Sequence, residues 1–140
     1  MLSESELLHI LLPSFGRTPH IRFLPEEKEC FEFWTWYVEH KVKGKIKGIA
    51  THIAHQVANN KSPLFGQKLA CMGKVKGMPD YIFMKRDKSL GLEFKVGKNK
   101  LSLSQGAVQM WFDQEGIPYY EVRSKEEAIE YLYREGFMND

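Results

Sequence analysis

The chain has 140 residues, 43% of them hydrophobic and 27% charged, which excludes a disordered or collagen-like protein and suits one globular domain. Its longest apolar run, residues 7–12, is too short to cross a membrane, the acidic start is unlike a signal peptide, and two cysteines make no disulfide framework, so we expect a cytoplasmic protein without a membrane partner. The net charge of +2 conceals fourteen Lys or Arg against three Asp or Glu in residues 41–100, an excess that favours a polyanionic partner but also fits a solvated lysine-rich surface.

The first part of the chain predicts two helices joined by a loop. Ser3 and Glu6 form a capping-box pattern before a short helix, and residues 13–25, which are rich in proline, predict a loop or arm. In residues 26–41 the helical spacing of apolar side chains outweighs a local strand-like alternation, so we predict a helix. Its apolar face is wide, which indicates deep burial or a subunit interface. Residues 41–47 alternate lysine with apolar residues or glycine, which predicts an edge strand or a basic loop.

The rest of the chain predicts a sheet with helices around it. Strands are expected in residues 49–57, 81–85, 90–96 and 117–123, and helices in residues 62–72, 102–115 and 124–134, each of which begins at a serine that can cap it. A turn at residues 86–89 joins the second and third strands, and a lysine-bearing loop at residues 97–101 follows the third. This order predicts an α/β domain with a mixed central sheet flanked by helices.

Three residues, Asp80, Glu93 and Lys95, are expected on one face of this sheet. Glu93 and Lys95 are two residues apart on a strand, so their side chains point the same way. A hairpin that turns at residues 86–89 puts Ile82 opposite Glu93 and Asp80 opposite Lys95. A register shifted by one residue would separate the three side chains.

Two carboxylates beside a lysine suit metal-assisted phosphate chemistry. Paired carboxylates repel each other unless a cation lies between them, and hard oxygen ligands favour Mg²⁺ or Mn²⁺. A neighbouring ammonium group can orient water and offset phosphoryl charge. A plain cross-strand ion pair explains the same spacing without catalysis. Lysines that could hold phosphates lie in the sequence on either side of the three residues: Lys74, Lys76, Lys98 and Lys100.

The order of motifs resembles a nuclease family. Gly77-Met-Pro-Asp80, followed after twelve residues by Glu93-Phe-Lys95, is similar to the PD-(D/E)xK nuclease core. The likeness continues through Leu101-Ser-Leu-Ser-Gln105, Trp111-Phe112, Gly116-Ile-Pro-Tyr-Tyr-Glu-Val-Arg123 and a Ser-x-x-Glu helix start. Together these segments resemble the VRR-NUC nucleases of the small stand-alone phage and bacterial type over residues 48–133. The resemblance implies a restriction-endonuclease-like fold in a single nuclease domain of residues 1–140, in which residues 1–47 form a helical, basic extension and a possible dimerisation region.

The resemblance also implies roles for individual residues. Asp80 and Glu93 would be metal ligands, with the backbone carbonyl of Phe94 as a further one. Lys95 would position or activate the attacking water. Gln105 would contact the site from its helix, although it also occupies the third helical position, where a capping box favours Glu or Gln. Both roles of Gln105 can hold at once.

One expected residue is missing from the likeness. Members of the family carry an acidic residue on an element before the motif, and the aligned residues 51–56 place Gln56 there. A neutral amide, bound through its carbonyl, is a weaker ligand, which leaves open whether the site is impaired and whether Gln56 is natural or engineered. His55 is expected to touch phosphate or the water shell of the metal. Zinc binding by His52, His55 and Cys71 is disfavoured because a fourth ligand at suitable spacing is missing.

The resemblance therefore implies a Mg²⁺- or Mn²⁺-dependent endodeoxyribonuclease that hydrolyses phosphodiester bonds as a homodimer, with branched DNA such as Holliday junctions as its substrate. A DNA-binding module with an impaired site and a nuclease or nickase on plain duplex are the alternatives. The aromatic residues Phe31, Phe33, Trp34 and Trp36 could stack on bases, but their helical spacing favours core or interface positions. Whether residues 41–47 bind DNA is open at this stage.

Overall fold

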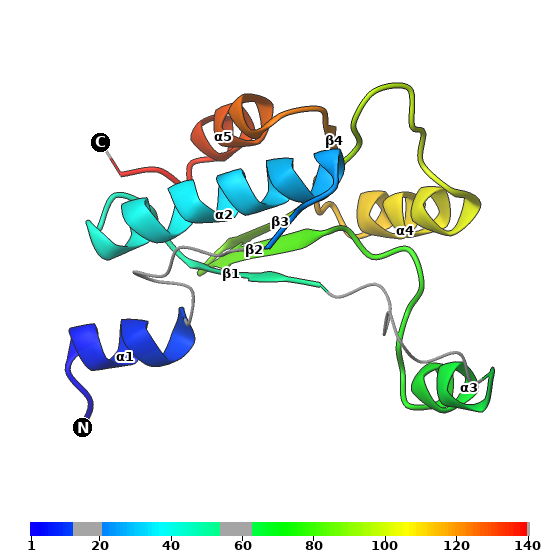
Figure 1. The fold of residues 1–140 in the computed structure, drawn as a ribbon, viewed down its shortest axis with the longest axis horizontal. Helices are drawn as coiled ribbons and strands as arrows, with labels where there is room; N and C mark the ends of the chain where they lie inside the picture. Colours follow the sequence, from blue (N-terminus) through cyan, green and yellow to red (C-terminus); the bar gives the residue numbers. More distant parts are fainter. Residues whose placement is uncertain (13–20, 54–62, 140) are drawn as a thin grey trace.

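A mixed four-stranded sheet forms the centre of the molecule (Figure 1). The computed structural model describes residues 1–12, 21–53 and 63–139. Within these ranges the strands are β1 (Ile49–His52), β2 (Tyr81–Lys85), β3 (Lys88–Phe94) and β4 (Tyr119–Val122), in the spatial order β1-β2-β3-β4. Strand β2 is antiparallel to both β1 and β3, whereas β4 runs parallel to β3. The prediction of an α/β domain with a mixed central sheet is confirmed.

The helices of the described ranges are α1 (Glu4–Leu11), α2 (Pro25–Val42), α3 (Pro63–Cys71), α4 (Leu103–Gln114) and α5 (Lys125–Arg134). Figure 1 shows α2 and α5 running together over one face of the sheet, while α3 projects away from it. Neither α1 nor α3 contains a buried residue. No helix in the described part of the chain combines the length and the apolar character that a membrane span needs.

The two faces of the sheet have separate hydrophobic cores. In β3 the side chains of Leu90, Leu92 and Phe94 enter the larger core, which α2 and α5 share, whereas Gly91 and Glu93 face α4. The smaller core under α4 contains Val108, Phe112 and Tyr119. Because side chains alternate along a strand, β3 can fill one core and still present a carboxylate on the other face.

Helix α2 is confirmed where the apolar spacing predicts it. Phe33 is completely buried and packs on the rings of Tyr81, Phe83 and Phe94 in the sheet. The wide apolar face of this helix therefore reflects, at Phe33, deep burial in the core. Although α2 precedes residue 48, it belongs to the same hydrophobic core as the strands.

The hairpin between β2 and β3 is tighter than the sequence predicts. Lys85 pairs with Lys88, so the turn contains two residues instead of four, and β3 spans Lys88–Phe94 instead of residues 90–96. The predicted pairing of Ile82 with Glu93 is wrong because Ile82 pairs with Gly91. The register is shifted by two residues, and a shift of two keeps every side chain on its predicted face.

Of residues 41–47, the first two end α2 and residues 43–47 form a basic loop, not an edge strand. Helix α2 continues to Val42, and the chain then turns so that the buried Ile46 makes an isolated bridge with Met138. The Lys41 ammonium donates to the carbonyl of Gly48, and partial burial lowers the pKa of Lys41. The strand predicted for residues 49–57 is seen as β1, and its last four residues lie outside the described ranges.

The predicted helix caps are present wherever the structure describes them. The side chains of Ser3 and Ser102 each accept from the backbone three residues on, and the side chains of Glu6 and Gln105 accept in return, which completes two capping boxes. Ser124 caps α5 through its hydroxyl group. The remaining predicted cap, Ser62, lies outside the described residues.

Candidate active site

Asp80 and Glu93 lie next to each other at one end of the sheet. Asp80 directly precedes β2, Glu93 is the last residue but one of β3, and their exposed fractions are 9% and 2%. The N–H of Asp80 donates to Glu93 Oε1 at 3.1 Å, and the N–H of Phe94 donates to Asp80 Oδ2 at 2.8 Å. Asp80 thus lies opposite Glu93, and its predicted pairing with Lys95 is wrong by the same two residues. Each buried carboxylate is satisfied by the backbone of the other strand.

The segment before Asp80 is fixed by two close backbone approaches. Gly77 has a φ of +98°, and a Cβ there would lie 2.4 Å from the carbonyl oxygen of Ser104 in α4. Pro79 is completely buried, and a Cβ at Gly91 would lie 2.7 Å from its ring. Only glycine tolerates both the positive φ and the contact at position 77. Gly77-Met-Pro-Asp80 is therefore held between α4 and β3, which sets the position of the Asp80 carboxylate.

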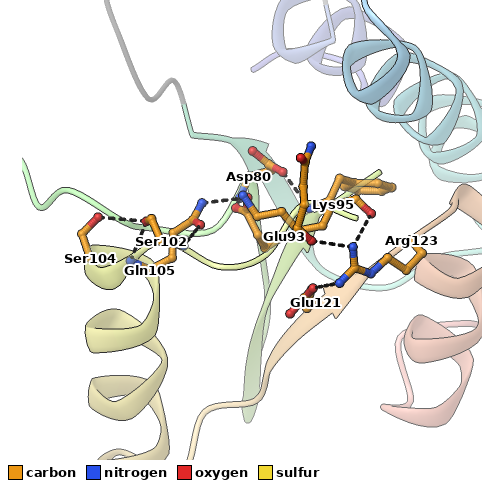
Figure 2. A network of polar contacts seen from close by, with 10 residues as sticks. Asp80, Glu93, Lys95, Ser102, Ser104, Gln105, Glu121 and Arg123 are labelled. Carbon is orange, nitrogen blue, oxygen red and sulfur yellow. Dashed lines mark hydrogen bonds and ion pairs between the residues drawn. The ribbon is translucent and has the colours of Figure 1, made fainter. Parts of the chain in front are cut away.

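Gln105 links the start of α4 to Glu93 (Figure 2). Its Oε1 accepts from the N–H of Ser102 at 2.9 Å, and its Nε2 donates to Glu93 Oε2 at 2.9 Å. Because the Ser102 N–H can only donate, the orientation of the amide is settled by chemistry. The structure thus combines the helix cap and the contact to the site in this one side chain, as the sequence allows.

Lys95 brings the positive charge to this group. Its Nζ lies 3.2 Å from Glu93 Oε2, and its side chain is only 13% exposed. Glu93 therefore receives an ammonium and an amide donor on one oxygen and a backbone N–H on the other. Such a shell fixes the carboxylate in one orientation and strengthens each bond through charge.

Glu26 is a further carboxylate of the site, and the sequence analysis missed it. It lies in the first turn of α2, far from the motif in sequence, yet ligand oxygens of Glu26, Asp80 and Glu93 all lie within 4.8 Å of one another. Helix α2, which precedes the motif in sequence, thus contributes a third carboxylate to the cluster. The sequence holds one weak signal for it, an acidic residue just after Pro25 at the start of a predicted helix.

The three carboxylates fit a hard divalent cation. Carboxylate oxygens are the ligands that Mg²⁺ and Mn²⁺ prefer, and three carboxylates with the Lys95 ammonium leave a formal charge of −2. Without a cation, carboxylates this close would repel each other. In the described part of the chain, neither histidine nor cysteine joins this cluster, and His52 instead packs edge-on against Tyr81.

The other predicted site residues lie on connecting segments or outside the described residues. Gln56 and His55 fall outside the described residues. The four predicted DNA-contacting lysines are exposed and lie on two segments: Lys74 and Lys76 between α3 and β2, Lys98 and Lys100 after β3. The structure therefore brings together Asp80, Glu93, Lys95, the Phe94 backbone and Gln105, with the lysines on connecting segments.

Arg123 holds the loop that carries Lys98 and Lys100, a role that the sequence analysis did not assign (Figure 2). Its Nη1 donates to the carbonyl oxygens of Asn99 at 2.7 Å and Gly97 at 3.2 Å, and its Nη2 pairs with Glu121. The guanidinium group of Arg123, the residue after β4, thus fixes the loop of residues 97–101 to the end of the sheet.

An open cleft of about 1060 Å³ leads to the carboxylates. Its lining includes the three acidic residues, Lys95, Gln105 and several aromatic side chains of α2 and the segment before it. Cys30 also lines the cleft, where burial and then the charge of Asp80 raise the pKa of its thiol to about 12. The thiol therefore stays protonated near neutral pH and is a poor nucleophile or metal ligand.

Comparison with solved structures finds the same fold in a protein described as "VRR_NUC domain protein". The two chains share 18% sequence identity, the match covers 81% of this chain and 89% of the other, and the TM-score is 0.62. No family model matches the sequence, and no curated protein does either. The arrangement of sheet and helices is thus that of a VRR_NUC domain, as expected for a restriction-endonuclease-like core.

Proposed function

We propose that this protein is a metal-dependent DNA endonuclease that hydrolyses phosphodiester bonds. The observation that carries the proposal is the meeting of Glu26, Asp80 and Glu93 within 4.8 Å, with Lys95 and Gln105 bound to Glu93 in an open cleft. The motif resemblance and the fold shared with a VRR_NUC domain protein support it. A structural ion pair would not need three carboxylates in a solvent-accessible cleft.

The residues of the site have separate roles in metal binding and in positioning water. Glu26, Asp80, Glu93 and the carbonyl of Phe94 would hold Mg²⁺ or Mn²⁺, which when bound polarises a phosphate and lowers the pKa of water. Lys95 positions the attacking water and offsets the charge of the phosphate. Gln105 and Lys95 both contact Glu93 Oε2, so Gln105 helps to hold Glu93 in the orientation in which it pairs with Lys95. The side chains of Asp80, Glu93 and Gln105 are held by backbone or capping contacts before substrate arrives, so these three need little reorganisation.

Glu26 weakens the case for an impaired site. Gln56 was the ground for that alternative because a neutral residue stands where the family has an acid. With Glu26 the site has a third carboxylate without any contribution from Gln56. Binding of the metal by the Gln56 carbonyl and of phosphate by His55 remain predictions for residues outside the described ranges.

For the substrate and assembly we propose branched DNA, such as a four-way junction, and a homodimer. Lysines on the segments before β2 and after β3 supply positive charge for phosphates on both sides of the cut: Lys74, Lys76, Lys98 and Lys100. The apolar residues Leu7, Ile10 and Leu11 of α1 are exposed, which supports the N-terminal region as the dimer surface. Two sites related by a twofold axis suit paired cuts in a symmetric junction.

Cleavage of end-labelled DNA tests the proposal. Four-way junctions, splayed arms, nicked duplex and linear duplex would each be incubated with Mg²⁺, with Mn²⁺ or with chelator. We expect metal-dependent cutting of branched DNA, and a loss of at least about 100-fold for Asp80→Asn and Glu26→Gln because each removes a charged metal ligand.

Glu39→Gln is the matched control because Glu39 lies on the same helix as Glu26 but is exposed near its other end. It should cut as fast as the unchanged protein. DNA binding without cutting under either metal would instead establish a binding module with an inactive site. Equal cutting of junction and linear duplex would replace the junction proposal with a duplex nuclease.

A further inference from the structure

Aromatic side chains line the cleft beside the carboxylates. Phe23 stacks on Phe31 with ring centroids 4.9 Å apart and an angle of 20° between the rings. Trp34 stacks on Tyr81, the residue after Asp80, at 5.6 Å and 13°. All four line the same cleft as Glu26, Asp80, Glu93 and Lys95. We call these four aromatic residues, Phe23, Phe31, Trp34 and Tyr81, the aromatic wall.

Two of the four residues of the aromatic wall do not belong to a hydrophobic core of the described residues. Tyr81 belongs to the larger core and Trp34 packs against it, which confirms the core position expected for Trp34. Phe23 and Phe31 are half-buried, and among the described residues neither is part of either core. They form a stacked pair that lines the same cleft as the carboxylates and the Lys95 ammonium. Aromatic surface in such a position is typical of a ligand contact.

The ligand that contacts the aromatic wall can be inferred from the substrate group that must bind at the carboxylates. If a phosphodiester lies at Lys95 and the acidic cluster, the base of an adjoining nucleotide lies within reach of the same cleft. In an intact duplex that base is stacked and paired, so it cannot contact a protein ring unless it leaves the stack. A base that is already unpaired can stack on an aromatic face whatever its sequence.

We infer that the Phe23–Phe31 pair stacks on an unpaired base next to the scissile phosphate. The inference rests on the proposed nuclease function and narrows its substrate to DNA with an unpaired nucleotide at the cut, such as a flap, a splayed arm or an opened junction. The cleft volume of about 1060 Å³ slightly exceeds the range of about 300–1,000 Å³ that is usual for small-molecule ligands, so one nucleotide fits.

Binding of matched DNA molecules tests the inference independently of cleavage. The first DNA is a splayed fork with one unpaired nucleotide at the expected cut, the second has an abasic site at that nucleotide, and the third is the fully paired nicked duplex. Fluorescence anisotropy in metal-free buffer would use the Asp80→Asn protein, which cannot cut. We expect removal of the base to weaken binding by at least about 5-fold, the lower limit for loss of one base–aromatic stack.

Variants of Phe31 separate stacking from simple apolar cover. Phe31→Leu keeps an apolar side chain but removes the ring, so it should bind the base-containing fork as weakly as the abasic one and show no further loss on the abasic one. Phe31→Trp should keep the discrimination. Tyr133→Leu is the control, since Tyr133 is an exposed aromatic residue of α5 that does not line the cleft, and it should behave like the unchanged protein.

Two outcomes would overturn the inference: equal binding of base-containing and abasic forks by the Asp80→Asn protein, or a loss for Phe31→Leu that is the same on both DNAs. In either case the phenylalanine pair only covers protein surface. A different result, discrimination in binding but no metal-dependent cutting of any DNA by the unchanged protein, would refute the proposed nuclease function and leave the base contact standing.

Discussion

Gln105 performs two separate tasks with the two ends of one amide, and substitutions can separate them. Gln105→Glu keeps an oxygen for the Ser102 N–H, as in an ordinary capping box, but replaces the donor to Glu93 by a second carboxylate. We expect its single-turnover cleavage rate to fall about 10- to 100-fold, because a charge-assisted hydrogen bond becomes a repulsion.

Ser102→Ala is the complementary variant. It removes the hydroxyl cap but keeps the backbone N–H that orients Gln105. Urea unfolding should show a loss of about 1 kcal/mol, as for other caps, with a much smaller change in cleavage rate than Gln105→Glu. If both variants lost the same activity, Gln105 would act only through the stability of α4.

Sequence spacing and motif resemblance suffice for the residues that lie on neighbouring strands. Asp80, Glu93 and Lys95 lie within one hairpin, so alternation alone brings them to one face. Glu26 could not be found in this way, because an acidic residue in the first turn of a helix is favoured by the helix dipole wherever that helix lies. Its position in the cluster depends on how α2 packs on the sheet, which is tertiary structure that local sequence patterns do not reveal.

The segment between α3 and β2 is fixed by glycine, and two glycines in it allow a controlled comparison. Gly73 and Gly77 both have positive φ, but a Cβ at Gly73 meets open space, whereas at Gly77 it would lie 2.4 Å from Ser104. Gly73→Ala should lower the free energy of unfolding by about 1–2 kcal/mol from backbone strain alone. Gly77→Ala should lose about 2 kcal/mol more and most of its activity, because α4 or Asp80 must move. Denaturant titration and cleavage assays check both, and equal losses would show that the close approach is unimportant.

Helices and strands with strong periodicity were predictable, whereas the lengths of turns and the secondary structure of short segments were not. Helix α2 and the capped helices α4 and α5 carry their signals locally. The two-residue turn of the β2–β3 hairpin was missed because the residues after it alternate equally well in either register. The structure of residues 43–47 was ambiguous because Ile46 bridges to Met138, near the other end of the chain.

At the scale of the whole molecule, two lysine-bearing segments, residues 41–47 and residues 97–101, lie at opposite ends of the sheet. Strand β1 runs antiparallel to β2, with His52 opposite Tyr81 beside the site and Ile49 opposite Met84 away from it. Residues 41–47 therefore adjoin the end of the sheet that is distant from Asp80. Lys98 and Lys100 follow β3 at the end that carries the site. Charge composition shows that lysines are abundant but not which of them can share a ligand with the carboxylates.

This division predicts which lysines contact DNA. Replacing Lys98 and Lys100 by alanine should weaken binding of a forked DNA and lower the slope of log Kd against log salt by up to about 2, since each phosphate contact contributes about 0.9. Replacing Lys43 and Lys45, two exposed lysines of the distant loop, removes the same charge and should leave the slope unchanged. Measuring both pairs in the Asp80→Asn protein without metal keeps the DNA intact. The two double variants lose the same net charge, so a difference between their slopes reports which lysines contact the DNA. A lower slope for the Lys43 and Lys45 variant would mean that the DNA extends along α2 to the far end of the sheet.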